Sequence, residues 1–262
     1  MKIIVCIKQV PDTTEVRLDP RTNTLIRQGV PSIINPDDKS GIEVALQLKE
    51  AHGAHVTVVS MGPPQAEVAL HEALAMGCDE AVLVTGKEFS GSDTYATATI
   101  LAAAIKQMDY DLVITGRQAI DGDTAQVGPQ LAEQLAIPQV TYAEEINYDG
   151  QALTVKRWYE DSSHLCRVRV PCLITVLSDV AEPRYMTVQG TVEAFEKDIQ
   201  KRSFDDLKDH LNPEWIGLQG SPTKVVKSFP KQAKTAGLKM VDLSVDEAVD
   251  RIISELEGLH LI

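Results

Sequence analysis

Short apolar runs alternate with helix-like segments over the first half of the chain, and this alternation restricts the fold more than any other feature. The four runs read KIIVCI, HVTVVSM, EAVLVTG and DLVITG. Runs that are apolar throughout are typical of strands buried on both faces of a parallel sheet. Strands separated by helices pair in one sheet, with helices on both of its faces. The sequence therefore predicts an α/β fold with a mostly parallel, doubly wound sheet.

The segments between the runs carry their own helix signals. Asn35 is placed as an N-cap with Pro36 at the first helical position, and Gly53 is placed to end that helix. A second helix begins after a proline pair and ends at Gly77, and an alanine-rich helix covers residues 94–108. The small side chains of this third helix suit close packing on a sheet, and alanine favours helix formation.

Two stretches depart from this alternation. Residues 15–27 contain a D-P-R-T-N turn between short alternating segments, which indicates a β-hairpin insertion. After Pro138 a second hairpin closes at Asp149-Gly150, and the next segment alternates before it becomes an apolar run. We expect these later strands to extend the sheet antiparallel at one edge.

The run at residues 112–114 leads into the loop that bears most on function. The chain breaks at Gly116 into polar residues and resumes as a helix with Val127, Leu131 and Leu135 on one face. Free N–H groups at a helix N-terminus attract phosphate, and glycine lets a backbone approach a ligand closely. The loop is therefore either a nucleotide site or a solvated connection capped by Asp or Thr. It contains neither the G-x-G-x-x-G fingerprint nor a P-loop.

Composition narrows the range of partners. The formal net charge of −13 at pH 7 argues against nucleic acid and against an anionic membrane as main partners. No stretch has the roughly 18 uninterrupted apolar residues of a membrane span, and the N-terminus reads as a strand and not as a signal peptide. The four cysteines form no C-x-x-C pair and no zinc pattern, which predicts buried free thiols in a cytoplasmic protein and no metal site.

The C-terminal part is organised differently. Residues 196–243 are polar with widely spaced apolar side chains, so alone they could hardly bury enough surface to fold. Residues 244–262 form an amphipathic helix that begins with a capping box of Ser244 and Glu247. We therefore divide the chain into an α/β domain at residues 1–195, an arm at residues 196–243 and a terminal helix. Either this chain's own core or a partner supplies the surface on which the arm and the helix pack.

Eight segments together carry a resemblance to a known family. In chain order they read VCIKQVPD, INPDD, VVSMGPP, EALAMGCDEA, DLVITGRQAIDGDTAQVGPQLAE, VKRWYEDSSHLCRVRVPCLITV, AEPRY and KTAGLKMVDL. Along essentially its whole length the chain resembles the small (beta) subunit of electron-transfer flavoproteins. The resemblance implies a Rossmann-like domain with a buried nucleotide, which is AMP in respiratory members and a second FAD in flavin-bifurcating members. It also implies a heterodimer, in which the arm and the terminal helix contact a larger alpha subunit that holds an electron-shuttling FAD.

The resemblance also assigns a nucleotide site through matching motifs. Asn35 would cap a helix whose N–H groups face the ligand, and Asp121 and Asp123 would meet ribose hydroxyls more naturally than phosphates. No side chain is assigned a catalytic role, because the redox chemistry belongs to the cofactor. The assigned residues are Cys6, Asn35, Pro36, Asp37, Asp38, Met61, Gly116, Arg117, Gln118, Ala119, Ile120, Asp121, Gly122, Asp123, Thr124, Ala125, Gln126 and Val127.

The central loop departs from the respiratory pattern. Respiratory relatives tend to read D-D-D-C-N-Q-T where this chain reads DGDTAQV, and the small Gly122 and Ala125 would admit a diphosphate and an extended flavin. This favours FAD at the beta site, reduced by NADH. One electron would go to ferredoxin or flavodoxin, and the other through the alpha FAD to an acyl-CoA dehydrogenase. The alternatives are a beta subunit that holds structural AMP, and a nucleotide-binding α/β domain unrelated to electron transfer.

The E-P-R-Y turn implies a docking surface. Glu182, Pro183, Arg184 and Tyr185 form the motif. In the turn after it, respiratory relatives tend to carry a leucine that docks onto an acyl-CoA dehydrogenase, and Val188 stands at that position here. A single surface valine is equally an ordinary loop residue, so docking by Val188 is one of two interpretations.

Overall fold

The computed structural model describes residues 1–12, 31–226, 237, 239 and 241–262. The chain divides into two compact units, Met1–Val226 and Lys227–Ile262. The hairpin predicted for residues 15–27 lies outside the described residues. On either side of it, β2 (Gln9–Pro11) and β3 (Ser32–Ile34) pair as a small antiparallel sheet.

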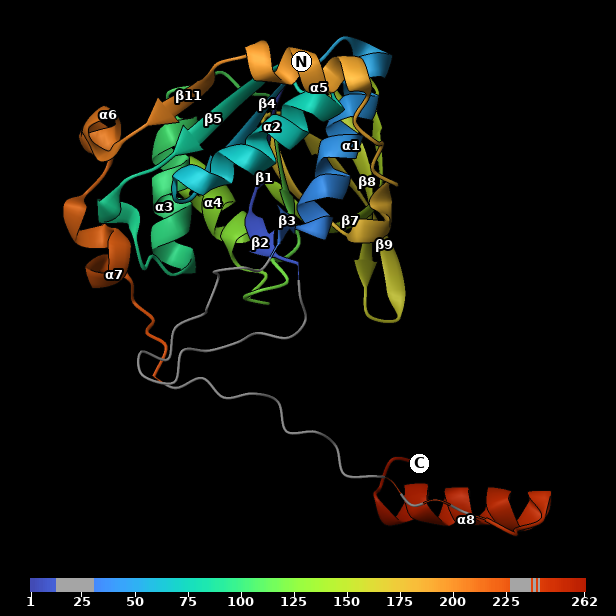
Figure 1. The fold of residues 1–262 in the computed structure, drawn as a ribbon. Helices are drawn as coiled ribbons and strands as arrows, with labels where there is room; N and C mark the ends of the chain where they lie inside the picture. The colour runs from blue at the N-terminus through green and yellow to red at the C-terminus, as the bar shows by residue number, and fades with distance from the viewer. Residues whose placement is uncertain (13–30, 227–236, 238, 240) are drawn as a thin grey trace. The chain divides into compact units, whose positions relative to one another are not determined.

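One nine-stranded sheet organises the first unit (Figure 1). Its order is β11-β5-β4-β1-β6-β10-β7-β8-β9, and the neighbours from β11 to β7 are parallel. The chain moves outward from β1 to β4 and β5, then returns to the other side of β1 with β6. This confirms the doubly wound, Rossmann-like α/β fold, with the strand order reversing between β1 and β6. The strands are β1 (Lys2–Ile7), β4 (His55–Met61), β5 (Glu80–Val84), β6 (Leu112–Gly116), β7 (Gln139–Tyr148), β8 (Ala152–Tyr159), β9 (Ser162–Arg169), β10 (Cys172–Val176) and β11 (Ile199–Arg202).

Helices cover both faces of the sheet (Figure 1). Each face has its own apolar core because side chains alternate along a strand: Val5 of β1 faces one helix layer and Ile4 the other. The first helix starts at Pro36 and ends at the left-handed Gly53, as predicted. The helices of one face are α1 (Pro36–His52), α2 (Glu67–Met76) and α5 (Val188–Glu196), and those of the other are α3 (Thr94–Ile105) and α4 (Val127–Leu135).

The strand β10 is the main correction to the predicted topology. The sequence predicts it among the antiparallel edge strands, but it lies between β6 and β7 and is parallel to both. All five of its residues are buried, as a strand covered on both faces requires. The two strands before it, β8 and β9, do extend the sheet antiparallel at one edge, as predicted.

Much of the predicted arm packs on the chain's own core. β11 adds a parallel edge strand beside β5, and Leu207, Leu211 and Ile216 join the core on the α3 side with at most 6% of their surface exposed. The first compact unit accordingly continues to Val226, past the boundary that the sequence suggests after residue 195. This segment includes α6 (Phe204–Leu207) and α7 (Gly217–Gly220); the 3-10 helices are η1 (Pro64–Ala66), η2 (Lys87–Phe89), η3 (Ser178–Val180), η4 (Lys208–His210) and η5 (Pro213–Trp215).

The second unit contains α8 (Val245–Gly258). Ser244 and Glu247 form the predicted capping box, in which the Ser244 N–H donates to Glu247 Oε2 at 2.9 Å. The apolar stripe of this helix is between 42% and 79% exposed at Val245, Val249, Ile252 and Ile253, which makes it a surface for packing. Among the described residues of either unit, no helix is long and apolar enough to cross a membrane.

Candidate functional site

The predicted site residues meet at the carboxyl edge of the sheet, where the strand order reverses. In open α/β sheets, ligands bind outside the carboxyl ends of the strands at this reversal point. Cys6 aligns with Thr115 of β6 on one side and with Val59 of β4 on the other, so the ends of these three strands lie together. The starts of α1 and α4 come to the same edge. Residues 117–126, which we call the β6–α4 loop, connect β6 to α4 there.

The predicted nucleotide-site residues differ in how far a ligand could reach them. Residues beneath the loop are buried, and residues at its tip are exposed. Exposure therefore separates the groups on the surface of the loop from those that lie beneath it. The buried residues are Cys6, Asn35, Asp37, Asp38 and Gly116; the half-buried ones are Met61, Arg117, Gln118, Ala119, Asp121, Ala125 and Val127; the exposed ones are Pro36, Ile120, Gly122, Asp123, Thr124 and Gln126.

The side chain of Asn35 holds the β6–α4 loop instead of capping α1. Its Nδ2 donates to the carbonyl oxygen of Gln118 at 2.8 Å, and its Oδ1 accepts the N–H of Ile120 at 3.0 Å. Asn35 occupies the N-cap position, but within the described part of the chain its side chain makes no cap hydrogen bond. The predicted N-cap position is therefore confirmed, but the side-chain cap bond is not made, because backbone groups far away in the sequence bond to both polar atoms of the amide.

Asp38 joins the end of β1 to the end of β6. Its Oδ1 accepts the N–H of Gly116 at 2.9 Å, and its Oδ2 accepts the N–H of Lys8 at 2.8 Å. Burial raises the pKa of Asp38 to about 7, while hydrogen bonds from Lys8, Asn35 and Gly116 oppose that rise. Position 116 must be glycine, because a Cβ there would collide with Asp38 Oδ1.

Lys8 is a site residue that the sequence patterns do not reveal. Besides its N–H, its carbonyl oxygen accepts the N–H of Asn35 at 2.9 Å, and its Nζ donates to Asp121 Oδ1 at 2.7 Å. Asp121 is expected to bind a ribose hydroxyl, but one of its carboxylate oxygens already accepts a hydrogen bond from Lys8. The signal that could have found Lys8 is its place directly after a buried strand at the carboxyl edge. We call Lys8, Asn35 and Asp38 the α1 clamp, because they tie β1 and the β6–α4 loop to the first turn of α1.

Asp37 and Arg117 face each other beside the loop with incomplete hydrogen bonding. Arg117 Nε lies 3.6 Å from Asp37 Oδ2, and neither of these buried atoms has a hydrogen-bond partner among the described residues. Burial raises the pKa of Asp37, and the charge of Arg117 opposes that rise. The Arg117 guanidinium also lies 6.0 Å from the centre of the Tyr142 ring. Buried polar atoms without partners are costly, so this pair is a place where a ligand could complete the bonding.

The outer half of the loop has an unusual backbone. Asp123 and Ala125 are left-handed, with φ of 48° and 53°. Gln118 Nε2 donates to Asp123 Oδ1 at 3.0 Å, and Thr94 Oγ1 donates to Gln126 Oε1 at 2.9 Å. Left-handed residues other than glycine cost roughly 1–3 kcal/mol each and persist where the surroundings fix them, often at ligand sites.

Glycine occurs at two positions in or next to the loop, and packing requires it at only one of them. A Cβ at Gly128 would lie 2.6 Å from Thr175 Cγ2 and 2.7 Å from Thr115 Oγ1, so only glycine lets α4 approach β6 and β10. At Gly122 no described atom lies within 4 Å of an added Cβ, and φ is outside the left-handed region. The fold itself therefore does not require glycine at position 122.

Cys6 lies in the core on the α3 side of the sheet. Burial, with a smaller contribution from the nearby Asp38 carboxylate, raises the pKa of the Cys6 thiol to about 12. A thiol with this pKa stays neutral at pH 7 and is a poor nucleophile. What the arrangement offers chemically is binding and orientation, with backbone groups and carboxylates around a helix start.

The E-P-R-Y turn lies at the opposite edge of the sheet, beside the last turns of α1. Arg184 Nε and Nη2 donate to the two oxygens of Glu43 at 2.8 and 2.9 Å, and Nη1 donates to Glu50. These hydrogen bonds raise the pKa of Arg184 above its ordinary value and fix the turn on α1. Val188, at the start of α5, is 86% exposed. Within the motif, Glu182 and Tyr185 are exposed, and Pro183 and Arg184 are half-buried.

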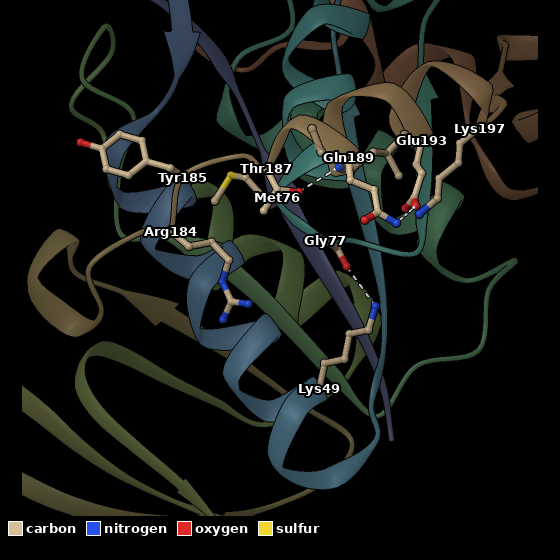
Figure 2. A pocket seen from close by; sticks show the side chains of 12 residues that line it. Lys49, Met76, Gly77, Arg184, Tyr185, Thr187, Gln189, Glu193 and Lys197 are labelled. Carbon is tan, nitrogen blue, oxygen red and sulfur yellow. Dashed lines mark hydrogen bonds between the residues drawn. The ribbon is translucent and has the colours of Figure 1, made fainter.

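A pocket of about 340 Å³ opens beside this turn (Figure 2). Its walls come from the ends of α1 and α2 and the start of α5, including Lys49, Arg184, Gln189 and Lys197. Lys49 Nζ donates to the Gly77 carbonyl oxygen at 2.9 Å. Because its cations are bonded to carbonyl and carboxylate oxygens, the pocket has mixed charge. It lies on the side of the unit that carries the E-P-R-Y turn and not at the carboxyl edge.

Comparison with known proteins identifies the family to which the chain belongs. The family model described as the electron transfer flavoprotein domain matches residues 22–207. The chain is 54% identical to the electron transfer flavoprotein subunit beta of Clostridium acetobutylicum, over 100% of both chains. Over 100% of both chains it is also 47% identical to the caffeyl-CoA reductase-Etf complex subunit CarD of Acetobacterium woodii and 47% identical to the acryloyl-CoA reductase electron transfer subunit gamma of Anaerotignum propionicum. The chain therefore belongs to the electron transfer flavoprotein family, and it is similar along its whole length to beta subunits of that family.

Proposed function

We propose that this chain is the beta subunit of a flavin-bifurcating electron transfer flavoprotein. In this role it pairs with an alpha subunit, binds FAD at the carboxyl edge of the sheet and receives a hydride from NADH. One electron goes to a low-potential acceptor such as ferredoxin or flavodoxin, and the other goes through the alpha subunit to an acyl-CoA dehydrogenase. Two relatives support the last partner, because their names place them with caffeyl-CoA reductase and acryloyl-CoA reductase.

The observation that carries the FAD assignment is the open space at Gly122. Packing explains glycine at position 116 and at Gly128, but no described neighbour explains it at position 122. Residues 122–124 are exposed, and the chain then enters α4, whose first N–H groups lack helical partners. A glycine that packing does not require suits a ligand lying directly against the backbone. A diphosphate needs such a close approach to the backbone more than a single phosphate does.

The chain's own residues would bind and orient this cofactor. Arg117 offers a charged guanidinium beside the loop, and the exposed carboxylate of Asp123 can accept a ribose hydroxyl. Bound flavin supplies the hydride and one-electron chemistry. The thiol of Cys6 takes no part in that chemistry, because its pKa of about 12 keeps it neutral.

The nucleotide content of the heterodimer tests this proposal. The chain is co-expressed with its alpha subunit, and the nucleotides released by denaturation are counted by chromatography. We expect two FAD and no AMP per heterodimer, together with NADH oxidation that requires both acceptors. One FAD and one AMP per heterodimer would refute the FAD assignment and favour a structural nucleotide in the beta subunit.

The exposed face of α5 is the proposed docking surface for the acyl-CoA dehydrogenase. Val188, Val192 and Phe195 lie at positions i, i+4 and i+7, so they share one side of the helix, and they are 86%, 59% and 73% exposed. Exposed apolar side chains gathered on one face mark an interaction site more often than single ones do. The hydrogen bonds from Arg184 to Glu43 hold the preceding turn in place.

The apolar stripe of α8 is the proposed contact with the alpha subunit. The helix is well capped, yet Val249 and Ile252 remain 48% and 49% exposed. The double variant Val249→Asp with Ile252→Asp should therefore weaken heterodimer formation, as measured by co-purification with a tagged alpha subunit. The double variant Asp246→Ala with Asp250→Ala, on the polar side of the same helix, is the control. Equal recovery of all three proteins would contradict the proposal.

A further inference from the structure

We propose that the α1 clamp is a positioning device: Asn35 and Asp38 act on the nucleotide by holding the β6–α4 loop in its binding shape, and not by touching the nucleotide. This inference rests on the proposed function, because it concerns the nucleotide of the same site. It gives two residues of the nucleotide motif a role that the resemblance does not imply. It also brings Lys8, which the resemblance leaves out, into the site.

The polar atoms of both side chains are engaged beneath the loop. Asn35 is 0% exposed and Asp38 is 7% exposed. Nδ2 and Oδ1 of Asn35 bond to Gln118 and Ile120, and the two oxygens of Asp38 bond to the N–H groups of Gly116 and Lys8. Because Asn35 lies wholly beneath the loop and Asp38 is only 7% exposed, almost none of either side chain is open to a ligand outside the loop. The bonds that both side chains make are to the backbone that carries the site.

The points at which the clamp holds the loop follow a regular spacing. Asp38 accepts a hydrogen bond from the N–H of Gly116. Asn35 donates to the carbonyl oxygen of Gln118 and accepts from the N–H of Ile120. These three points are every second residue, so the clamp holds the chain at regular intervals from the end of β6 into the loop. The first half of the loop is thus bonded to α1. Between the first two of these points, the N–H of Arg117 donates to the carbonyl oxygen of Val176 at 2.8 Å, so the segment is held on β10 as well.

The outer half of the loop is built on this fixed segment. The N–H groups of Gly122 and Asp123 donate to the carbonyl oxygen of Ala119 at 3.1 and 2.9 Å, which closes a turn. Lys8 Nζ then holds Asp121 at 2.7 Å. The residues that could contact a ligand are therefore held in place by the clamp and by the turn at Ala119. A loop ordered before binding costs the ligand less conformational entropy, so loss of the clamp should appear as loss of affinity.

The chemistry of each clamp residue suggests a nearly isosteric variant. Asp38→Asn turns one acceptor into a donor that faces a backbone N–H. Asn35→Asp turns the donor to Gln118 into an acceptor that faces a carbonyl oxygen. Asp79→Asn is the matched control, because Asp79 accepts the N–H of Val56 at 2.9 Å and an ammonium N–H of Lys49 at 2.6 Å at the other edge of the sheet. Lys8→Met removes only the half-exposed ion pair, and it carries the test if the buried variants do not assemble.

Amide hydrogen exchange and nucleotide binding are measured together on the heterodimer after the nucleotide of the beta subunit has been removed. In the wild-type protein and in Asp79→Asn, we expect the amides of residues 116–123 to be protected before any nucleotide is added. In the clamp variants these amides should exchange at least tenfold faster, and saturating FAD should restore protection. The dissociation constants of the probes FAD and AMP should both rise at least tenfold in the clamp variants and stay within twofold in Asp79→Asn.

Different results separate the possible failures. Weaker nucleotide binding with unchanged loop protection would overturn the inference, because it would mean that the side chains contact the nucleotide directly. Unchanged protection together with unchanged affinity would overturn it as well. If the wild-type protein bound neither probe while loop protection still depended on the clamp, the proposed function would fail, and the clamp would still be shown to order the loop.

Discussion

Replacing Asp38 by Asn removes a buried carboxyl group and should change how the stability of the protein depends on pH. Burial raises the pKa of Asp38 from its ordinary 3.8 to about 7 in the folded protein. A group whose pKa is higher in the folded state contributes its full stability below the unfolded pKa, and this contribution is lost as pH rises through the folded pKa. The wild-type protein should therefore lose stability between about pH 4 and pH 7 relative to the variant.

The size of this loss follows from the pKa difference. Between pH 5 and pH 6 the unfolded carboxyl group is ionised while the folded one keeps its proton, and this pH unit costs about 1.4 kcal/mol. The folded group is half ionised at pH 7, so the two units from pH 5 to pH 7 together cost about 2 kcal/mol. The lost acceptor in Asp38→Asn adds a pH-independent destabilisation of about 1–3 kcal/mol. The two effects separate because only the first changes with pH.

Urea unfolding of the heterodimer at pH 5, 6, 7 and 8 and at one protein concentration measures both effects. The free energy of unfolding of the wild type minus that of Asp38→Asn should fall by about 2 kcal/mol from pH 5 to pH 7 and level off near pH 8. The corresponding difference for Asp79→Asn should change by less than about 1 kcal/mol over this range. Hydrogen bonding keeps the pKa of Asp79 below its ordinary value despite partial burial, and the ion pair of Asp79 with His55, 3.7 Å away, is half-exposed. Parallel curves for the wild type and Asp38→Asn would refute the reasoning, and so would a difference that rises with pH.

Three further changes test the fold and the proposed surfaces. Gly122→Asp with Ala125→Asn should cost one FAD per heterodimer and abolish NADH oxidation, because the added side chains fill the space above the loop; unchanged FAD content would contradict this. Leu207→Ala should lower the free energy of unfolding by about 2–5 kcal/mol, since this side chain is fully buried, and an unchanged urea midpoint would show otherwise. Val188→Asp should weaken acyl-CoA dehydrogenase binding at least tenfold in surface plasmon resonance with FAD content unchanged, and equal affinity would remove Val188 from the docking surface.

Local sequence patterns were enough to predict strands that are buried on both faces and helices whose ends carry a local signal. β1, β4, β5 and β6 follow from their apolar runs, because a strand buried on both faces needs apolar side chains throughout. The start and end of α1 follow from Pro36 and Gly53, and the start of α8 follows from the Ser244 capping box, because those signals act within a few residues. The end of α8 at Gly258 was not predicted, since the sequence suggested a helix to residue 262.

Elements fixed by distant partners could not be predicted in this way. β11 joins the sheet through backbone bonds to β5, and its side chains IQKR carry no strand pattern. The position of β10 depends on which strands it meets, and a run of five apolar residues does not encode its neighbours. The bonds from Asn35 reach backbone groups more than 80 residues further along the chain. The residue type could be predicted to matter at this position, but its partner could not.

The geometry of α1 bears on the route that electrons take. The first turn of the helix carries Asp38 at the carboxyl edge of the sheet, where we propose the nucleotide, and Glu50, twelve residues later, accepts a hydrogen bond from Arg184 of the E-P-R-Y turn. At 1.5 Å per residue these two positions are about 18 Å apart along the helix. Electron transfer slows steeply with distance, so a partner docked on α5 is poorly placed to receive electrons directly from a nucleotide held at the β6–α4 loop. A carrier between the two surfaces removes this difficulty, and the FAD proposed for the alpha subunit is such a carrier. The separation of the two surfaces along one helix thus supports a path in which the beta nucleotide receives the hydride and the alpha subunit delivers the electron to the dehydrogenase.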